Sequence, residues 1–362
     1  MVGVDGTPAM RPVLSGTEVY ARSIIQALAG SRGGRGLRIY ANAARRPEWL
    51  AGDVEFRGIP FPRAWSHLRL RRALRADGPD VVFIPAHVLP LGLPLASVVT
   101  VHDVGHRHDR RSYSRAAWWY LELTTRYAAR RATRLIAVSQ STADDLKRFY
   151  GVAGGRVSVI HSGVDPRMTR QAPEHVGAVL EELGLDEPYF LYVGRNHPRK
   201  NLPMLRRAFR EARARGLEAQ LVLAGPGHEA AGHEDGVVMI SYVPAERMPA
   251  LYAGAIALLL PSRFEGFGFP VIEAMSCGTA VVASTAGALP EIVGTAGVLL
   301  RPDDAGVWSH AMLELAADPQ LQRRLIAAGL GRSAAFSWEN ASAKTWSVLE
   351  TAARVGQAAS DS

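Results

Sequence analysis

Residues 255–276, AIALLLPSRFEGFGFPVIEAMS, join a buried strand to a helix through a turn that contains two glycines. The apolar run 256–260 predicts the strand. Pro270 suits the first turn of the helix, because its missing N–H is not needed there. Such a turn presents free backbone amides at a helix N-terminus, where a diphosphate can bind. Glu265 and Glu273 can accept hydrogen bonds from sugar hydroxyls beside it; the alternative is that both are ordinary solvated charges.

Short apolar runs alternate with longer helical stretches along the whole chain, a pattern typical of parallel sheets covered by helices. The expected strands are 2–4, 37–40, 81–84, 97–101, 134–138, 157–160, 189–193, 220–224, 237–240, 256–260, 280–283 and 297–300. The expected helices are 17–29, 63–76, 114–131, 141–150, 200–215, 245–253, 270–276, 304–316 and 318–331. We therefore predict an α/β protein of two Rossmann-like doubly wound domains, with ligands bound in an interdomain cleft that the C-terminal ends of both sheets face.

The domain boundary is expected in the stretch 164–188, which mixes Pro, Gly and charge with weak periodicity. We place the first domain at 1–168 and the second at 169–337. A last helix over 338–355 opens with a serine N-cap and is expected to pack back on the first domain. The small, polar tail that follows is expected to fray.

The composition of the 362 residues, 48% apolar and 21% charged, is that of a soluble globular protein. The sequence contains no run of about 18 consecutive apolar residues, so no membrane-spanning helix is predicted. The start, Met1–Asp5, has no basic stretch before an apolar one, so we expect no signal peptide. The single cysteine, Cys277, excludes an internal disulfide and any cysteine-based zinc cluster. We expect a cytoplasmic protein.

The net charge of +8 is concentrated in one half of the chain. Residues 1–168 contain 25 Lys and Arg against 13 Asp and Glu, a balance of +12, whereas the remainder has 17 against 21, a balance of −4. This predicts an anionic partner for the first half. A membrane surface and a phosphorylated acceptor both fit. Nucleic acid is not expected, because the chain has no recognised binding module.

The stretch Arg63–Arg75 is the most basic part of that half, and Trp65 and Leu68 are interleaved with its arginines. A basic amphipathic helix of this kind can lie on anionic lipid as a peripheral contact at the inner face of the membrane. In the alternative interpretation Trp65 and Leu68 pack on the sheet and the arginines are solvated. A second basic cluster directly precedes the aromatic residues 118–120; its members are Arg107, Arg110, Arg111 and Arg115.

Residues 192–201, YVGRNHPRKN, follow the first strand of the second domain and open a helix. Arg195 and Lys200 can both turn toward the ligand and neutralise a leaving diphosphate. The chain has no Asp-x-Asp motif. A metal-bridged diphosphate is therefore disfavoured, and we expect no metal site.

Two further turns lie at strand ends in the first half. Gly16 begins a helix after the first strand, where a glycine lets the backbone approach a ligand. His102 and Asp103 end a buried strand, a place where polar side chains of parallel sheets meet ligands.

The spacing from Glu265 to Glu273 resembles the Glu-x7-Glu signature of the retaining GT-B glycosyltransferases of family 4, also called glycosyl transferases group 1. The resemblance implies that Glu265 binds the donor sugar and Glu273 the nucleotide ribose. Phe267 and Gly268 would donate backbone amides to the sugar or phosphate. Val243 falls in the segment that borders the nucleotide base in that family.

The segment with Arg195 and Lys200 is similar to the Gly-Arg…Lys-Asn segment of the same family, whose Arg and Lys hold the β-phosphate. Gly16 resembles the family's glycine loop near the acceptor and the phosphates. His102 matches a histidine that contacts the sugar, with Asp103 as its neighbour or an acceptor contact. Between these two residues no general base is chosen.

The resemblance implies an acceptor-side first domain and a donor-binding second domain. The expected reaction is retaining transfer of a hexose from a GDP- or UDP-sugar, such as GDP-mannose or UDP-glucose, to a hydroxyl of a glycan, lipid-linked or other acceptor. No cofactor is expected. The alternatives are a sugar-nucleotide epimerase of the same fold and a non-enzymatic two-domain sugar-binding protein.

Overall fold

The computed structural model describes residues 1–11, 15–61, 65–86, 88–185, 188–228 and 234–360. The chain divides into two compact units. The first consists of Met1–Gly163 and Ser337–Ser362, and the second is Val164–Phe336. The division falls after Gly163, a few residues before the boundary expected from the sequence.

The first unit is built on a sheet of seven parallel strands in the order β3-β2-β1-β4-β5-β6-β7. The strands are β1 (Val2–Asp5), β2 (Leu37–Ala41), β3 (Glu55–Gly58), β4 (Val81–Ile84), β5 (Ser97–Val101), β6 (Arg134–Ala137) and β7 (Val157–Val159). Three strands in the middle of the sheet, β1, β4 and β5, are buried along their whole length, which explains their continuous apolar runs. The sequence did not predict β3, because this edge strand is largely exposed and has no such run.

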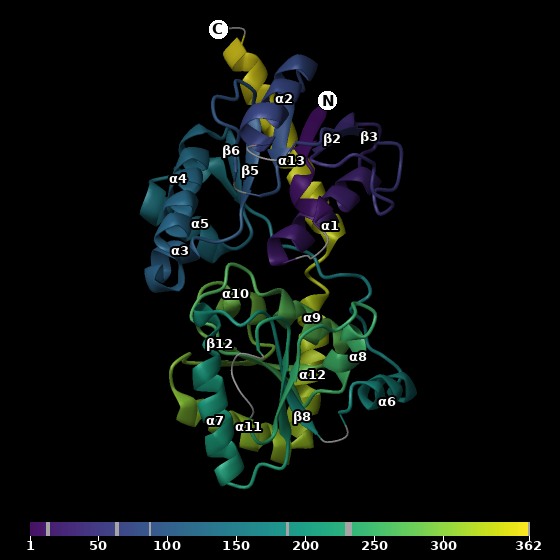
Figure 1. Cartoon of the computed structure of the whole chain (residues 1–362), viewed down its shortest axis with the longest axis vertical. Coiled ribbons are helices and arrows are strands. Elements are labelled where there is room, and N and C mark those ends of the chain that lie inside the picture. Colours follow the sequence, from purple (N-terminus) through teal and green to yellow (C-terminus); the bar gives the residue numbers. More distant parts are fainter. Residues whose placement is uncertain (12–14, 62–64, 87, 186–187, 229–233, 361–362) are drawn as a thin grey trace. The chain divides into compact units, whose positions relative to one another are not determined.

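Helices flank this sheet, as Figure 1 shows. They are α1 (Gly16–Gly30), α2 (Arg71–Asp77), α3 (Gly105–His108), α4 (Arg115–Arg131), α5 (Gln140–Tyr150) and α13 (Trp338–Ser360), with short turns η1 (Thr7–Met10), η2 (Ser66–Leu70, a π-helix), η3 (Arg110–Ser112) and η4 (Gly154–Arg156). The C-terminal helix α13, yellow in Figure 1, packs on α1, β4 and β5. It continues to Ser360, five residues beyond the expected end at 355, and the last two residues of the tail lie outside the described residues.

The second unit has six parallel strands in the order β10-β9-β8-β11-β12-β13. They are β8 (Tyr189–Val193), β9 (Gln220–Ala224), β10 (Val237–Ile240), β11 (Ala257–Leu260), β12 (Ala280–Ser284) and β13 (Val298–Leu300). The two central strands, β8 and β11, are neighbours although more than sixty residues separate them in sequence. Because the strands are parallel, the loops that follow β8 and β11 leave the same edge of the sheet.

The helices of the second unit are α6 (Pro173–Glu182), η5 (Pro198–Lys200), α7 (Leu202–Ala214), α8 (Met248–Ala253), α9 (Phe269–Cys277), α10 (Leu289–Val293), α11 (Ala305–Ala317) and α12 (Pro319–Ser333). Two of them, α6 and α10, were not predicted. The first lies in the stretch taken as an interdomain connection, which belongs to this unit. The second is only five residues long, too short for helical periodicity to be recognised.

The basic stretch expected as one helix over 63–76 is divided differently. Arg63 and Ala64 lie outside the described residues, and the π-helix η2 precedes α2. Trp65 is buried and its Nε1 donates to the Ile59 carbonyl at 2.7 Å. Leu68 is 58% exposed. The interpretation in which both side chains pack on the sheet therefore holds for Trp65 and was wrong for Leu68. Among the described residues, none of the helices is both long and apolar enough to span a bilayer.

Candidate active site

The loop between β11 and α9 has the geometry that its sequence predicts. The strand β11 is fully buried, and Gly268 ends the loop at φ +98°, a conformation that side chains rarely adopt. A Cβ at Gly268 would also lie 2.8 Å from the Leu289 side chain. Helix α9 then begins with Phe269, and Pro270 lies in its first turn. Glycine at this position and proline after it therefore allow the sharp entry into the helix.

Glu265 lies in this loop and is only 5% exposed. Its Oε1 accepts hydrogen bonds from the Ser262 hydroxyl, at 2.6 Å, and from Lys200 Nζ. Its Oε2 lies 3.4 Å from a guanidinium nitrogen of Arg199, which also donates to the Phe264 carbonyl at 3.1 Å. The carboxylate is thus held at both oxygens, one by an ammonium and a hydroxyl, the other by a guanidinium.

These partners decide the protonation state of Glu265. Burial acts to raise the pKa of the carboxyl, but the nearby charges of Lys200 and Arg199 and the hydrogen bonds from Lys200 and Ser262 together lower it below its usual value. The side chain is therefore a carboxylate at neutral pH, able to accept hydrogen bonds from ligand hydroxyls. The adjacent cations exceed it by one charge, which favours an anionic ligand.

The backbone of Glu265 is fixed as firmly as its side chain. Its carbonyl accepts from the Ala288 amide at 2.9 Å, in the turn between β12 and α10. Gly287 precedes that residue at φ +58°, and a Cβ there would lie 2.3 Å from the same carbonyl oxygen. Only glycine fits this close approach of two loops.

Lys200 is oriented by the loop that follows β8. The next residue, Asn201, has φ +60° and is the one described residue other than glycine with a positive φ. Its side-chain amide donates to the Pro302 carbonyl at 2.5 Å and to Asp303 Oδ1 at 3.3 Å. The same Oδ1 accepts from Arg263 at 2.7 and 2.8 Å. Asp303 thus links the loop that carries Lys200 to the loop that carries Glu265.

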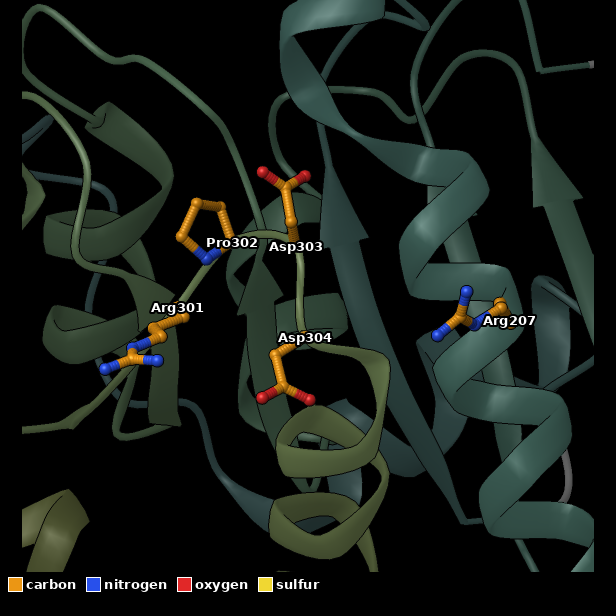
Figure 2. A pocket seen from close by; sticks show the side chains of 5 residues that line it. All are labelled: Arg207, Arg301, Pro302, Asp303 and Asp304. Atoms are coloured by element: carbon orange, nitrogen blue, oxygen red, sulfur yellow. The ribbon is translucent and has the colours of Figure 1, made fainter.

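Figure 2 shows Asp303 and Asp304 as part of a pocket beside this junction, with Arg207 of α7 on one side and Arg301 on the other. No role was predicted for Asp303 or for Arg199. The sequence signal for Arg199 was its position directly before Lys200 at a strand end. Nothing in the sequence indicated that Asp303, about 100 residues further along the chain, would meet Asn201.

Arg195 lies on the same β8–α7 loop, and its side chain is exposed. Its carbonyl accepts from the Tyr192 hydroxyl at 3.2 Å, next to Gly194, whose φ of +148° the loop needs. The structure therefore brings Lys200, with Arg199, onto Glu265 and leaves Arg195 at the surface of the loop.

Glu273 lies on α9, about one turn into the helix and eight residues after Glu265 in the sequence. It is half-buried, and its Oε2 accepts from the Tyr252 hydroxyl at 2.7 Å. Burial raises the pKa of Glu273 from 4.5 to about 7; the Tyr252 hydrogen bond opposes this shift and the charge of Asp165 adds to it. The two glutamates of the signature therefore differ in electrostatics. Glu265 has cations against it, whereas Glu273 has a phenol and a second acid near it.

The remaining predicted residues of the second unit are placed as follows. Phe267 is buried and packs edge-to-face on Phe269 and Phe336, at ring distances of 5.2 and 5.9 Å. Val243 is half-buried in the segment before α8, directly after Tyr242, which is 79% exposed. No three His, Cys, Asp or Glu side chains in the described parts of the chain come together in a group that could hold a metal ion.

Three predicted residues belong to the first unit. Gly16 is exposed at the start of α1. His102 Nε2 donates to the Pro85 carbonyl at 2.7 Å, since a carbonyl can only accept, and its ring packs edge-to-face on Tyr20 at 4.7 Å. Asp103 Oδ1 accepts from the Gly105 amide at 2.9 Å. His102 and Asp103 are both half-buried at the C-terminal end of β5, where the fold predicts ligand contacts.

His106 and His108 lie in the short helix α3. His106 is buried against Glu122, with 3.3 Å between Nε2 and Oε2, and against the Tyr150 hydroxyl at 3.0 Å. His108 Nε2 lies 2.7 Å from Asp145 Oδ2. Both histidines thus contribute to packing between α3, α4 and α5.

The sequence matches two family descriptions, one in each half. Residues 14–167 match "Glycosyltransferase Family 4" and residues 187–318 match "Glycosyl transferases group 1". Escherichia coli O-antigen chain mannosyltransferase B is 31% identical over 306 residues, which cover 79% of this chain and 76% of that protein. The MMP alpha-(1->4)-mannosyltransferase of Mycolicibacterium hassiacum is 31% identical over 325 residues, 82% of this chain and 76% of that protein.

Solved structures share the fold over nearly the whole chain. Sucrose-phosphate synthase from Thermosynechococcus elongatus has a TM-score of 0.77 at 21% identity and covers 97% of this chain and 98% of its own. Anabaena HepE in complex with UDP-glucose has a TM-score of 0.77 at 17% identity, with 97% and 99% covered. The predictions of family, fold and enzyme class are confirmed: the chain belongs to the group 1 glycosyltransferases of family 4 and is a transferase enzyme with the GT-B fold.

Proposed function

We propose that this chain is a retaining hexosyltransferase that moves a mannose- or glucose-type sugar from a nucleoside-diphosphate sugar to an acceptor hydroxyl. The donor would be GDP-mannose or UDP-glucose, and the acceptor a glycan, anionic or lipid-linked. The observation that carries the proposal is the buried carboxylate of Glu265 between Lys200 and Arg199. Two relatives are mannosyltransferases by name, and one solved neighbour contains UDP-glucose.

The chemistry follows from these three side chains. Lys200 is the compact cation that would turn from Glu265 to the β-phosphate, where negative charge develops as the sugar leaves. Arg199 would stay on Glu265 Oε2 and keep the carboxylate ionised while Lys200 is engaged. Glu265 would then accept hydrogen bonds from sugar hydroxyls. We propose that this requires no metal, because the cations supply the charge.

Glu265 is poorly suited to be a nucleophile, since Arg199 would still hold its Oε2 and the Ser262 hydroxyl its Oε1 after Lys200 has turned away. A hydrogen-bonded, strongly stabilised carboxylate attacks carbon weakly. We therefore propose the retaining mechanism that the family resemblance implies, in which the departing phosphate takes the proton of the acceptor hydroxyl. Arg195 would approach the same phosphate from the exposed part of its loop.

The other predicted residues complete the proposal. Glu273 would bind the ribose, Phe267 and Gly268 would donate amides to the sugar or phosphate, and Val243 would border the base. In the first unit, the acceptor side, Gly16, His102 and Asp103 would contact the acceptor or the transferred sugar. We place the enzyme in the cytoplasm, with peripheral contact to an anionic membrane surface.

The test is release of nucleoside diphosphate from GDP-mannose and UDP-glucose by the wild type and by Lys200→Met. Removing a charge that acts on the leaving group is expected to lower turnover by at least about 100-fold. Lys147→Met, at an exposed lysine of α5, is the matched control and should leave release unchanged.

Near-normal release by Lys200→Met would defeat the assignment of the donor site. Conversion of a UDP-sugar to its epimer without any release of nucleotide would defeat the transferase mechanism and establish the epimerase alternative. Binding of donor with neither outcome would indicate a sugar-binding protein.

A further inference from the structure

We propose that the first unit docks on anionic lipid through one surface, called here the α4 face. This inference rests on the peripheral membrane contact proposed above and names the surface that makes it. The α4 face combines helix α4, the η2 turn and the loop at 91–92. Its apolar side chains are all between 50% and 59% exposed: Leu68, Leu91, Trp119, Tyr120 and Leu123.

Helix α4 directs one aromatic and aliphatic stripe outward. Trp119 and Leu123 are four residues apart and therefore lie on the same side of the helix, with Tyr120 beside them. The neighbouring Trp118 behaves oppositely. It is half-buried, and its Nε1 donates to the His106 carbonyl at 2.8 Å. Trp119 is thus exposed because of its position on the helix, and the aromatic residues 118–120 are not all exposed alike.

The charges of α4 match this stripe. All residues of α4 are described, and the one acid among them, Glu122, is buried. Arg107, Arg126 and Tyr150 hydrogen-bond its carboxylate, which removes it from the surface. The exposed charged residues of the helix are Arg115, Arg126, Arg130 and Arg131. A face with Trp, Tyr and Leu among arginines, without an exposed acid, is typical of helices that lie in a bilayer interface.

The α4 face continues beyond the helix through two hydrogen bonds. The Gly92 amide donates to the hydroxyl of Tyr127, which belongs to α4, at 2.7 Å. The adjacent Leu91 amide donates to Nδ1 of His67, which belongs to η2, at 3.3 Å. The loop at 91–92 therefore bridges the two elements. Leu68, directly after His67, and Leu91 extend the stripe of α4 toward the basic stretch of η2 and α2.

The charge selects lipid as the occupant. A second copy of this chain would bring the same arginines against each other, and like charges disfavour such an interface. An anionic bilayer offers negative headgroups over an apolar layer. Arginine side chains can reach these headgroups while their aliphatic parts, with Trp119 and Leu123, enter the boundary below.

The experiment is flotation of the full chain with vesicles of phosphatidylglycerol and phosphatidylethanolamine, and with neutral phosphatidylcholine vesicles. We expect the wild type to float with anionic vesicles at low salt and to be released at high salt. The double variant Trp119→Ser, Leu123→Ser should bind at least about tenfold more weakly, because it loses two exposed apolar anchors. Val355→Ser, at an exposed residue of α13, is the matched control and should bind like the wild type.

A second variant, Arg130→Ser with Arg131→Ser, tests the charge without touching the apolar stripe and should weaken anionic binding similarly. Absence of wild-type flotation at low salt would overturn the proposal. Equal flotation of wild type and both variants would overturn it as well, since lipid would then bind elsewhere. The proposal would also be overturned if the wild type self-associates without binding vesicles and the double variant abolishes this self-association.

Release of nucleoside diphosphate in the absence of vesicles separates this proposal from the proposed function. The double variant should retain normal release, because neither residue belongs to the donor site. A wild type that floats but releases no nucleotide from any donor would refute the proposed function and leave the α4 face intact.

Discussion

Glu273 offers the sharpest link between a single contact and a measurable property. Burial raises the pKa of its carboxyl from 4.5 to about 7, against the opposing Tyr252 hydrogen bond. The folded state then binds this proton more tightly than the unfolded state does. The resulting stabilisation is fully present below pH 4.5 and is lost as the pH rises toward about 7.

The size of the effect follows from the shift. At about 1.4 kcal/mol per pH unit, the change from 4.5 to about 7 corresponds to about 3 kcal/mol. Because the side chain is half-buried and water reaches part of it, we expect about 1 to 2 kcal/mol. Glu273→Gln removes the titration and keeps an oxygen that can accept from Tyr252. The variant should therefore be more stable than the wild type at pH 8, and the difference should be much smaller at pH 5.

Thermal unfolding at both pH values provides the assay. For a unit of this size, the expected difference is a melting temperature about 2–6 °C higher for Glu273→Gln at pH 8. Glu218→Gln, at an exposed residue of the same unit, is the control and should change neither value. A difference of equal size at pH 5 and pH 8, or a wild type that is the more stable protein at pH 8, would refute the reasoning.

Substitutions at three further positions test the donor loops. Arg199→Met leaves Lys200 as the remaining cation beside Glu265, so the pKa of the Glu265 carboxyl should rise and the acidic limb of the pH–rate profile should move to higher pH. An unchanged acidic limb would contradict the pairing of Arg199 with Glu265. Gly287→Ala places a Cβ against the Glu265 carbonyl at a positive φ, so it should lower both the melting temperature, by several degrees, and the turnover. An unchanged melting curve would show that the two loops can separate. Asn201→Leu should destabilise the protein more than Asn201→Gly does, because both variants lose the hydrogen bond to the Pro302 carbonyl but only leucine is strained at φ +60°. Equal melting temperatures of the two variants would argue against strain.

Most of the fold could be predicted from the sequence, because buried parallel strands consist of short runs of apolar residues. Twelve expected strands have counterparts in the structure, and the strand that was missed, β3, is an exposed edge. Helix α6 was missed for a related reason, since only Val179 of its ten residues is buried. Local patterns reveal elements that bury a face, and these two elements bury little.

The candidate site was predictable in part. Spacing and turn chemistry identified Glu265, Glu273 and Lys200, but not how they pair. Lys200 meets Glu265 because β8 and β11 are neighbours in the sheet, and a strand order of this kind cannot be read from local patterns. The same crossover explains why Arg199, which lies against Glu265, was overlooked. The role of Arg195 at the phosphate stays a prediction.

The proposed enzyme transfers a hexose with retention of the anomeric configuration. The measurement is NMR of the product that the wild type forms from GDP-α-mannose or UDP-α-glucose with an acceptor that supports nucleotide release, read at the anomeric carbon of the new bond. We expect an α-linked product from either α-donor. A β-linked product would contradict retention, because inversion requires a single displacement assisted by a base, a role that we assign to none of these residues.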